Sequence, residues 1–178
     1  METRKVKVYI AASLDGYIAH SDGNIDWLDS VARANEDYGY ATFIETIDTV
    51  IMGRKTYEKV LSFGGGFPHK GRDCYVLTRT ERITDGQVHF YSGPADELLD
   101  QIRRQPGKDI FIDGGSEAID LFRKKGLIDS YTVSIIPILL GEGIPLFKES
   151  MEELPLKLVE ATTFDSGLVQ LTYEPIKK

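Results

Sequence analysis

The chain has 178 residues, of which 21 are basic and 28 acidic, so its net charge is −7. This balance disfavours a general role in binding nucleic acid or a membrane surface, because such proteins usually carry an excess of lysine and arginine. The single cysteine, Cys74, allows no intrachain disulfide, and its apolar neighbours indicate a buried side chain. The three histidines lack the spacing of metal ligands, so we expect no metal site.

The length suits one domain, which we expect to span residues 1–178. The N-terminal residues pass from charged side chains directly into an apolar run, without the pattern of a signal peptide. No apolar run is long enough to cross a bilayer. A cytoplasmic location is therefore the simplest expectation.

Strand-like and helix-like segments alternate along the first half of the chain. A strand is predicted over residues 6–14, and a polar loop is predicted over 17–29. A helix is predicted to fill much of residues 31–47, where four apolar side chains share one helical face: Tyr40, Phe43, Ile44 and Ile47. The next predicted elements, in chain order, are a strand at 49–52, a helix that starts near Thr56, and strands at 73–78 and 87–91.

The second half continues this alternation and closes with two consecutive strands. A helix after Pro94 precedes a strand at 110–112, and a helix that ends at Gly126 precedes a strand at 129–138. The last two strands, 156–164 and 168–173, flank a turn-forming Asp-Ser-Gly sequence that is typical of a hairpin. Several strands are apolar throughout, as expected when helices cover both faces of a parallel sheet. The pattern predicts an α/β fold with a mostly parallel sheet and an antiparallel C-terminal hairpin.

Two corners that contain glycine follow buried strands. The first comprises Gly53, Arg54, Lys55 and Thr56, and the second comprises Gly114, Gly115 and Ser116. In open α/β sheets, ligands bind at the carboxyl ends of the strands, where helix N-termini offer free N–H groups to anions. Glycine would let a pyrophosphate approach the backbone closely. These two corners therefore indicate a ligand that contains phosphate.

A third corner adds a hydroxyl and a cation, Thr78 and Arg79, after the strand that ends near Leu77. Arg54 and Arg79, on neighbouring strand ends, could clamp the 2′-phosphate of NADP through charge-assisted hydrogen bonds. The sequence thus predicts NADP(H) rather than NAD(H). A Gly-Arg pair alone is more often a plain turn, and no G-x-G-x-x-G motif follows the first strand. The hypothesis depends on the three corners occurring together.

Four motifs, in this order, resemble the dihydrofolate reductase superfamily: 12–19 (ASLDGYIA), 50–57 (VIMGRKTY), 112–116 (IDGGS) and 136–147 (IPILLGEGIPLF). The chain most resembles the branch that includes the C-terminal reductase domain of the bifunctional riboflavin-biosynthesis deaminase/reductase. The resemblance implies a three-layer α/β/α fold on a mostly parallel sheet of about eight strands. It also implies NADPH-dependent reduction of a ring such as a pterin or an aminopyrimidine, and relatives in the riboflavin pathway suggest a homodimer.

The resemblance also implies the roles of individual residues. Ala12 would face the nicotinamide amide, Ile18 would cover the ring from a mobile loop, and the peptide bond between Gly114 and Gly115 would be cis. The residues implied to contact the cofactor are Ala12, Ile18, Gly53, Arg54, Lys55, Thr56, Leu77, Thr78, Arg79, Ile112, Gly114, Gly115 and Ser116.

The region expected to hold the substrate departs from the folate reductases, in which a tryptophan is followed by Leu-Pro and an acidic residue. Here Trp27 has no proline after it. By its distance from Gly53, Asp37 is the best match for the acid, and Asp26 and Asp29 are weaker ones. We predict that Asp37 contacts the substrate and is a buried carboxylate of raised pKa that supplies the proton, itself or through a water molecule that it holds. The alternative for Asp37 is a solvated helix carboxylate that forms a salt bridge. Trp27 would stack on a flat substrate or lie in the core.

Three functions are compatible with these motifs. The preferred one is an NADPH-dependent reductase of a small heterocycle, either a pterin or dihydrofolate-like ring or a 5-amino-6-(5-phosphoribosylamino)uracil-like compound. The alternatives are an NADP(H)-binding module without catalysis and a structural or partner-binding α/β domain. The H-x-E and C-x-x-C motifs of the riboflavin-pathway deaminase are missing, which favours a stand-alone reductase.

Overall fold

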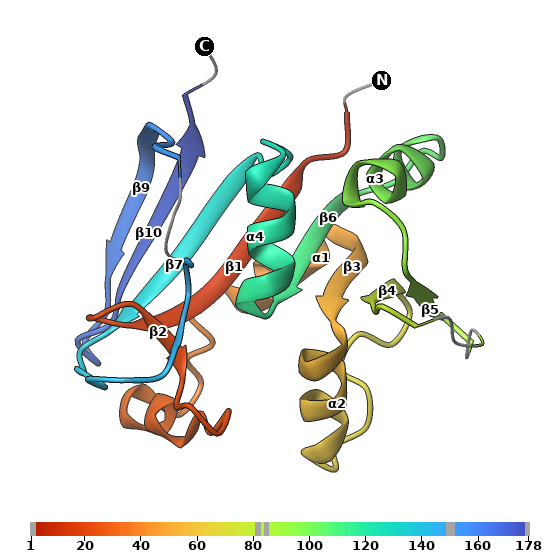
Figure 1. Cartoon of the computed structure of the whole chain (residues 1–178). Coiled ribbons are helices and arrows are strands. Elements are labelled where there is room, and N and C mark those ends of the chain that lie inside the picture. Colours follow the sequence, from red (N-terminus) through yellow and green to blue (C-terminus); the bar gives the residue numbers. More distant parts are fainter. Residues whose placement is uncertain (1–2, 81–82, 84–85, 149–151, 177–178) are drawn as a thin grey trace.

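The computed structural model describes residues 3–80, 83, 86–148 and 152–176. An eight-stranded sheet runs through it in the order β5-β4-β3-β6-β1-β7-β10-β9 (Figure 1). Its strands are β1 (Val6–Ser13), β3 (Ile47–Gly53), β4 (Asp73–Leu77), β5 (Val88–Tyr91), β6 (Asp109–Gly114), β7 (Ser130–Ile136), β9 (Leu156–Thr163) and β10 (Val169–Pro175). A separate sheet pairs β2 (Tyr17–Ala19) with β8 (Ile144–Pro145).

From β5 to β7 in the sheet order, each strand is parallel to the next one. The central strands are apolar on both faces, and Val8, Ile51 and Ile112 are completely or almost completely buried. β10 is antiparallel to both β7 and β9, so the last two strands form the predicted hairpin. The parallel direction brings the carboxyl ends of β1, β3, β4 and β6 to one edge of the sheet, which we call the carboxyl edge.

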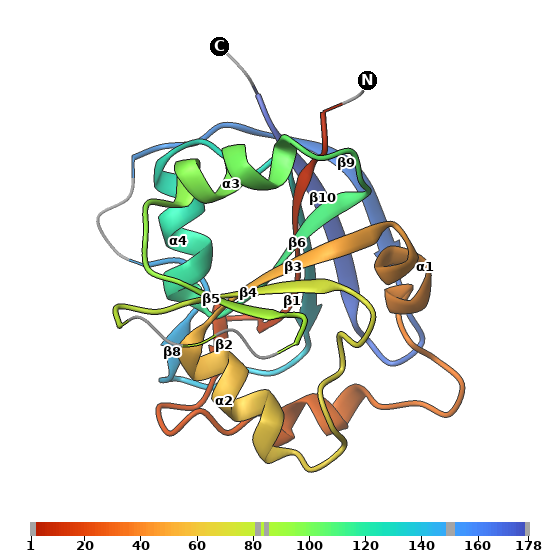
Figure 2. The same ribbon diagram turned by 90° about the vertical axis from the view of Figure 1, so that its right-hand side faces the viewer.

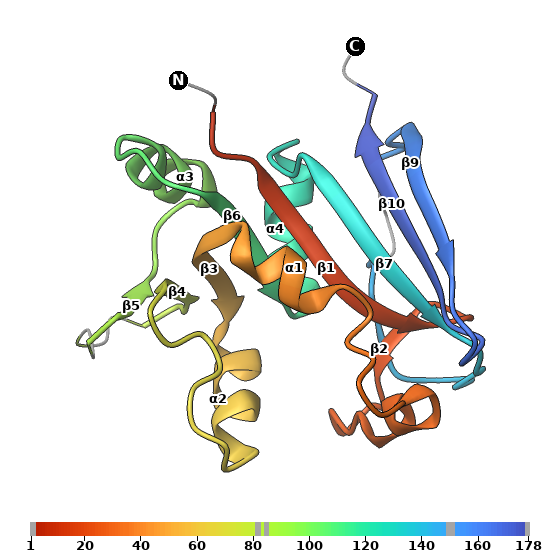
Figure 3. The same cartoon turned by 180° about the vertical axis from the view of Figure 1, so that it is seen from behind.

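Helices cover both faces of the sheet, which confirms the predicted three-layer fold. The helices of the described chain are the 3₁₀ helix η1 (Asp26–Val31), α1 (Tyr40–Glu45), α2 (Arg54–Ser62), α3 (Ala95–Arg103) and α4 (Ser116–Lys124). Figure 2 shows α3 and α4 on one side of the sheet and α1 on the other, and Figure 3 shows the α1 face from behind. α2 extends beyond the carboxyl edge (Figure 1). No helix within the described ranges is long and apolar enough to cross a bilayer.

The prediction of a helix through much of residues 31–47 is wrong. Asn35 and Tyr38 have φ angles of 63° and 57°, which lie in the left-handed region that a right-handed helix excludes. α1 therefore begins only at Tyr40 and has six residues. Phe43 still packs against the sheet, so the apolar face was identified correctly while the extent of the helix was not. Sequence reasoning also missed β2 and β8, which are too short to give an alternating pattern.

Candidate functional site

The two glycine corners meet at the carboxyl edge of the sheet. β3 and β6 are neighbours, and Met52 pairs with Gly114. A Cβ built on Gly53 would lie 3.8 Å from both the Gly114 carbonyl oxygen and the Gly115 amide nitrogen. A Cβ built on Gly115 would lie 3.3 Å from the hydroxyl oxygen of Thr56. The peptide bond between Gly114 and Gly115 is cis, as the family resemblance implies.

A helix begins at each of these corners, and no side chain in the described part of the chain caps either helix. α2 starts at Arg54 directly after Gly53, and α4 starts at Ser116 directly after Gly115. The first N–H groups of a helix have no partner within the helix, and they carry the positive end of its dipole. The first turn of α2 holds no acidic residue. The N-termini of α2 and α4 thus begin at one place, where an anion would be stabilised.

The third corner lies next to the first. Leu77 pairs with Gly53, so Thr78 and Arg54 are the next residues on neighbouring strand ends. Thr78 donates its amide to the carbonyl of Tyr91 at 2.9 Å, and its hydroxyl turns back to the carbonyl of Thr80 at 3.2 Å. Arg79 is exposed.

Arg54, the other arginine predicted to bind phosphate, is also at the surface. Its guanidinium lies 3.0 Å from the carboxylate of Glu58, one helical turn further along α2, and 43% of its side chain is exposed. An exposed pair of this kind contributes little to stability, so a ligand phosphate could take the place of Glu58 at small cost. Lys55 is likewise exposed, so the start of α2 presents two cations to solvent.

Ala12 and Ile18 lie near the same edge, on β1 and β2. Ala12 is 1% exposed and faces the same cluster of apolar side chains as α4, while Ile18 is partly buried against that cluster. Asp15, between the two strands, accepts hydrogen bonds from the Ser13 hydroxyl, the Gly141 amide and the Leu140 amide. These bonds lower the pKa of Asp15, with the Ser13 hydroxyl as the largest cause. The segment that carries Ile18 is thereby attached to the loop after β7.

The backbone at the carboxyl edge fits a dinucleotide. A Cβ on Gly115 would crowd the Thr56 hydroxyl at 3.3 Å, and the N-termini of α2 and α4 begin beside this contact, with Arg54 and Lys55 in the first turn of α2. In this arrangement Thr56, Gly115 and Ser116 would hold phosphate oxygens through their amides. Arg54 and Lys55 would supply charge. NADPH, once bound, would supply a hydride.

The expected environment of Asp37 is not found. We expected a buried carboxylate of raised pKa as one possibility, but Asp37 is exposed. Hydrogen bonds from the Ala41 amide and then from the Gly39 amide lower its pKa. The carboxylate thus stabilises the start of α1, and the solvated alternative is the correct one. Asp26 and Asp29 lie in η1, in its first turn.

Trp27 lies in the core and does not present a free ring face to a flat substrate. It is 7% exposed and packs with Val31, Ile136 and Leu168 beneath η1. Its indole N–H is buried and has no hydrogen-bond partner in the described part of the chain. The stacking role is therefore corrected in favour of the core alternative.

Sequence reasoning missed a pair of ionisable side chains beside the glycine corners. Asp113 is the residue before Gly114 on β6, and its carboxylate oxygen Oδ2 lies 2.9 Å from Nε2 of His69. The Asp113 side chain is 22% exposed, whereas His69 is only 2% exposed. Tyr40 is close to this carboxylate: burial first and the charge of Asp113 second raise the pKa of Tyr40 to about 12. Asp113 is thus a partly exposed carboxylate beside the glycine corners at the carboxyl edge.

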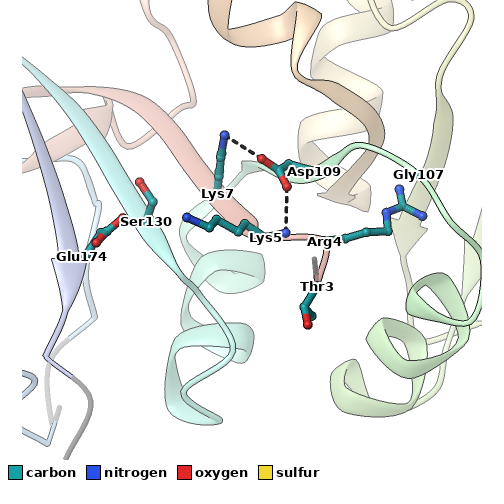
Figure 4. A pocket seen from close by; sticks show the side chains of 8 residues that line it. All are labelled: Thr3, Arg4, Lys5, Lys7, Gly107, Asp109, Ser130 and Glu174. Atoms are coloured by element: carbon teal, nitrogen blue, oxygen red, sulfur yellow. Dashed lines mark hydrogen bonds and ion pairs between the residues drawn. The ribbon is translucent and has the colours of Figure 1, made fainter. Parts of the chain in front are cut away.

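A pocket of about 440 Å³ lies at the opposite, amino-terminal edge of the sheet (Figure 4). Its lining residues are Thr3, Arg4, Lys5, Lys7, Gly107, Asp109, Ser130 and Glu174. Asp109 occupies its wall: one carboxylate oxygen lies 2.8 Å from Nζ of Lys7, and the other accepts the Lys5 amide at 2.8 Å. None of the residues predicted to bind cofactor or substrate lines this pocket.

Comparison with known proteins agrees with the fold and with the motifs. A family model described as the RibD C-terminal domain matches residues 4–170. The uncharacterized protein YwjB of Bacillus subtilis (strain 168) is 42% identical over 171 residues, which cover 96% of this chain and 97% of YwjB. The crystal structure of a protein from Shewanella sp. PV-4, whose printed name assigns it to riboflavin biosynthesis, superposes on this chain with a TM-score of 0.90. The two sequences are 34% identical, and the match covers 97% of this chain and 99% of that chain.

The fold is also shared with a folate reductase. Dihydrofolate reductase from Enterococcus faecalis, complexed with NADP(H) and RAB-propyl, has a TM-score of 0.71 at 20% identity and covers 97% of both chains. At this identity the likeness shows the common architecture, an eight-stranded sheet with helices around it.

Proposed function

The chain belongs to the RibD C-terminal domain family, and from this we propose that it is an NADPH-dependent reductase that transfers a hydride to a small heterocyclic compound. The substrate is a pterin or dihydrofolate-like ring or a 5-amino-6-(5-phosphoribosylamino)uracil-like compound. In this proposal residues 1–178 form one domain, and the protein works in the cytoplasm. Its partner is the small-molecule substrate, and it binds neither nucleic acid nor a membrane.

The observation that carries this proposal is the contact between the two glycine corners. Thr56 at the start of α2 and Gly115 at the start of α4 are close enough for one pyrophosphate to meet both helix N-termini. Arg54 and Arg79 follow adjacent strands and account for a preference for NADPH over NADH, because only NADPH has the 2′-phosphate that they would pair with.

Reduction of a C=N or C=O bond requires a proton in addition to the hydride. Asp113 is the best candidate to hold and orient the water molecule that delivers this proton. It directly precedes the glycine corner, part of its side chain is open to solvent, and one of its two oxygens is held by His69. The protein would otherwise act by fixing the distance and orientation of the two reactants, with Ala12 and Ile18 on the ring side of the cofactor.

The proposed homodimer has a candidate surface on β9, the edge strand of the sheet. Leu156, Leu158 and Val159, which we call the β9 surface, are 40%, 50% and 53% exposed. An exposed edge strand offers unpaired backbone groups to another chain, and exposed apolar side chains on it favour such an association. A second copy of the chain is the partner that the family resemblance favours.

Thermal melting with NADPH, NADH and no ligand tests the cofactor part of the proposal. A ligand at about 100 times its Kd stabilises a fold by about 2.7 kcal/mol, so NADPH is expected to raise the melting temperature measurably and more than NADH at equal concentration. An unchanged melting temperature would favour a structural or partner-binding domain.

Oxidation of NADPH in the presence of a panel of pterins and aminopyrimidines then tests catalysis. A raised melting temperature without any oxidation of NADPH would favour a binding module.

A further inference from the structure

His69 is a polar residue in an aromatic environment. It lies in the segment between α2 and β4, and its ring packs edge to face against Phe67 at 5.5 Å and Phe111 at 6.1 Å between ring centroids. Only 2% of the side chain is exposed. A buried imidazole normally has both ring nitrogens hydrogen-bonded, because an unpaired polar group loses its hydration without compensation.

Only one of the two ring nitrogens has a partner in the described part of the chain. Nε2 lies 2.9 Å from Oδ2 of Asp113, whereas Nδ1 is buried without a hydrogen bond. A proton on Nδ1 would be a donor with nothing to receive it. The neutral tautomer with the proton on Nε2 avoids this, and its N–H donates to the Asp113 carboxylate.

The hydrogen bond with His69 involves only one of the two carboxylate oxygens of Asp113. Oδ2 is held by a side chain that is packed between two rings, while Oδ1 accepts no hydrogen bond from the residues that the structure describes. Since 22% of the Asp113 side chain is exposed, the free oxygen can meet a ligand. A hydrogen bond to one carboxylate oxygen fixes the orientation of the side chain. The other oxygen then has a fixed position relative to a bound ligand.

We propose that His69 is a positioning residue, whose imidazole orients the Asp113 carboxylate toward a polar N–H or O–H group of the substrate. The inference rests on the proposed function in assigning Asp113 to the reductase site. It extends that function by making a buried histidine, 44 residues away in the sequence, part of the site. His69 itself does not touch the substrate.

The first test needs neither substrate nor cofactor. ¹H–¹⁵N correlation spectra of the histidine rings distinguish the two neutral tautomers, and we expect His69 to carry its proton on Nε2. Asp113→Leu, which removes the acceptor at similar size, is expected to abolish this preference. A proton on Nδ1 in the wild type, or a tautomer that is unchanged in Asp113→Leu, would overturn the proposal.

The second test separates positioning from simple packing. His69→Gln places an amide nitrogen close to the position of Nε2, whereas His69→Phe fills the aromatic site without a donor. With any compound that the wild type reduces, we expect His69→Phe to lower kcat at least tenfold at an unchanged KM for NADPH, and His69→Gln to recover most of it. Equal kcat in the two variants would contradict the proposal.

The change in melting temperature on adding NADPH tests the proposed reductase function separately from the proposed role of His69. His69 is not part of the glycine corners, so both variants are expected to retain the wild-type shift. If the wild type itself shows no shift, the proposed reductase function fails, while the tautomer measurement still decides whether His69 orients Asp113.

Discussion

Thr56 and Gly115 approach each other across the ends of β3 and β6, so that a Cβ on Gly115 would lie 3.3 Å from the Thr56 hydroxyl oxygen. Each residue belongs to the first turn or the cap of a helix without a side-chain cap. Two motifs that are far apart in the sequence thus form one set of amide donors. This relationship explains why both motifs contain glycine at the strand end: side chains there would occupy the space in which phosphate oxygens are expected.

Gly115→Ala tests this explanation directly. The added methyl group would crowd Thr56 and reduce the room for a pyrophosphate. We expect the Kd for NADPH to rise at least tenfold, which corresponds to about 1.4 kcal/mol, as measured by calorimetric titration. Gly65→Ala is the matched control, because a Cβ on Gly65 meets nothing within 4 Å. An unchanged Kd in Gly115→Ala would show that the cofactor lies elsewhere.

Arg54→Ala combined with Arg79→Ala tests the assignment of the 2′-phosphate. A hydrogen bond to a charged group contributes about 1.5–3 kcal/mol, so the double variant is expected to lose roughly 10- to 100-fold or more in NADPH affinity and little in NADH affinity. Lys59→Ala, a change of charge later in α2, is expected to affect both cofactors weakly. The assignment is wrong if the double variant loses NADPH and NADH affinity to the same extent.

The parts of the fold and site that could be predicted from sequence are those determined locally. Apolar runs identify buried strands, and glycines at their ends mark the corners, so Gly53, Gly114 and Gly115 were placed correctly at one edge of the sheet. The cis bond between Gly114 and Gly115 came from the family resemblance, since nothing in the composition of the chain specifies it.

The features that could not be predicted depend on the direction in which a side chain points and on contacts between segments that are distant in the sequence. The spacing from Gly53 located Asp37 along the chain, but it gave no information on whether the carboxylate points to the sheet or to solvent. Asp37 instead accepts the Gly39 and Ala41 amides, after two residues with positive φ interrupt the expected helix. The spacing of the histidines bears only on metal binding, so it gives no sign that His69 meets Asp113, 44 residues away in the sequence.

Asp113→Asn and Asp37→Asn show which of the two carboxylates takes part in proton delivery. Acid–base catalysis by a positioned side chain typically contributes about 10²- to 10⁴-fold. Asp113→Asn removes the carboxylate that would orient the proton-delivering water, so it is expected to lower kcat by at least about 100-fold for a compound that the wild type reduces. Asp37→Asn is expected to leave kcat near the wild-type value and to lower the melting temperature slightly, because Asp37 stabilises the start of α1. The reverse result would restore Asp37 as the proton donor.

The lowered pKa of Asp15 predicts that the free energy of unfolding depends on pH. Its pKa is lowered in the folded protein, chiefly by the Ser13 hydroxyl and also by the Gly141 and Leu140 amides. Its contribution is therefore fully present above the unfolded pKa of about 3.9, and it is lost as the pH falls through the lower folded pKa. The melting temperature of Asp15→Asn is expected to lie below that of the wild type at pH 7, with a difference that shrinks below about pH 4.

Asp165→Asn serves as the control for this measurement, because Asp165 is exposed in the hairpin turn between β9 and β10. Its melting temperature is expected to follow that of the wild type across the pH range. A deficit of Asp15→Asn that is equally large at every pH would mean that the charge of Asp15 does not matter for these hydrogen bonds.

Leu158→Glu tests the proposed dimer. A charge in the middle of the β9 surface would be costly to bury, so we expect the variant to be monomeric by light scattering at concentrations at which the wild type is a dimer. Thr163→Glu, at the other end of the same strand, is the control and is expected to stay dimeric. A wild type that is monomeric throughout would refute the dimer.

Amide chemical shifts during a titration with NADPH test the central claim most directly. If the dinucleotide lies across the two helix N-termini, the amide signals of Thr56, Gly115 and Ser116 shift saturably and with a common Kd. Shifts confined to the pocket at the amino-terminal edge, around Lys5 and Asp109, or no saturable shifts at all, would contradict the account.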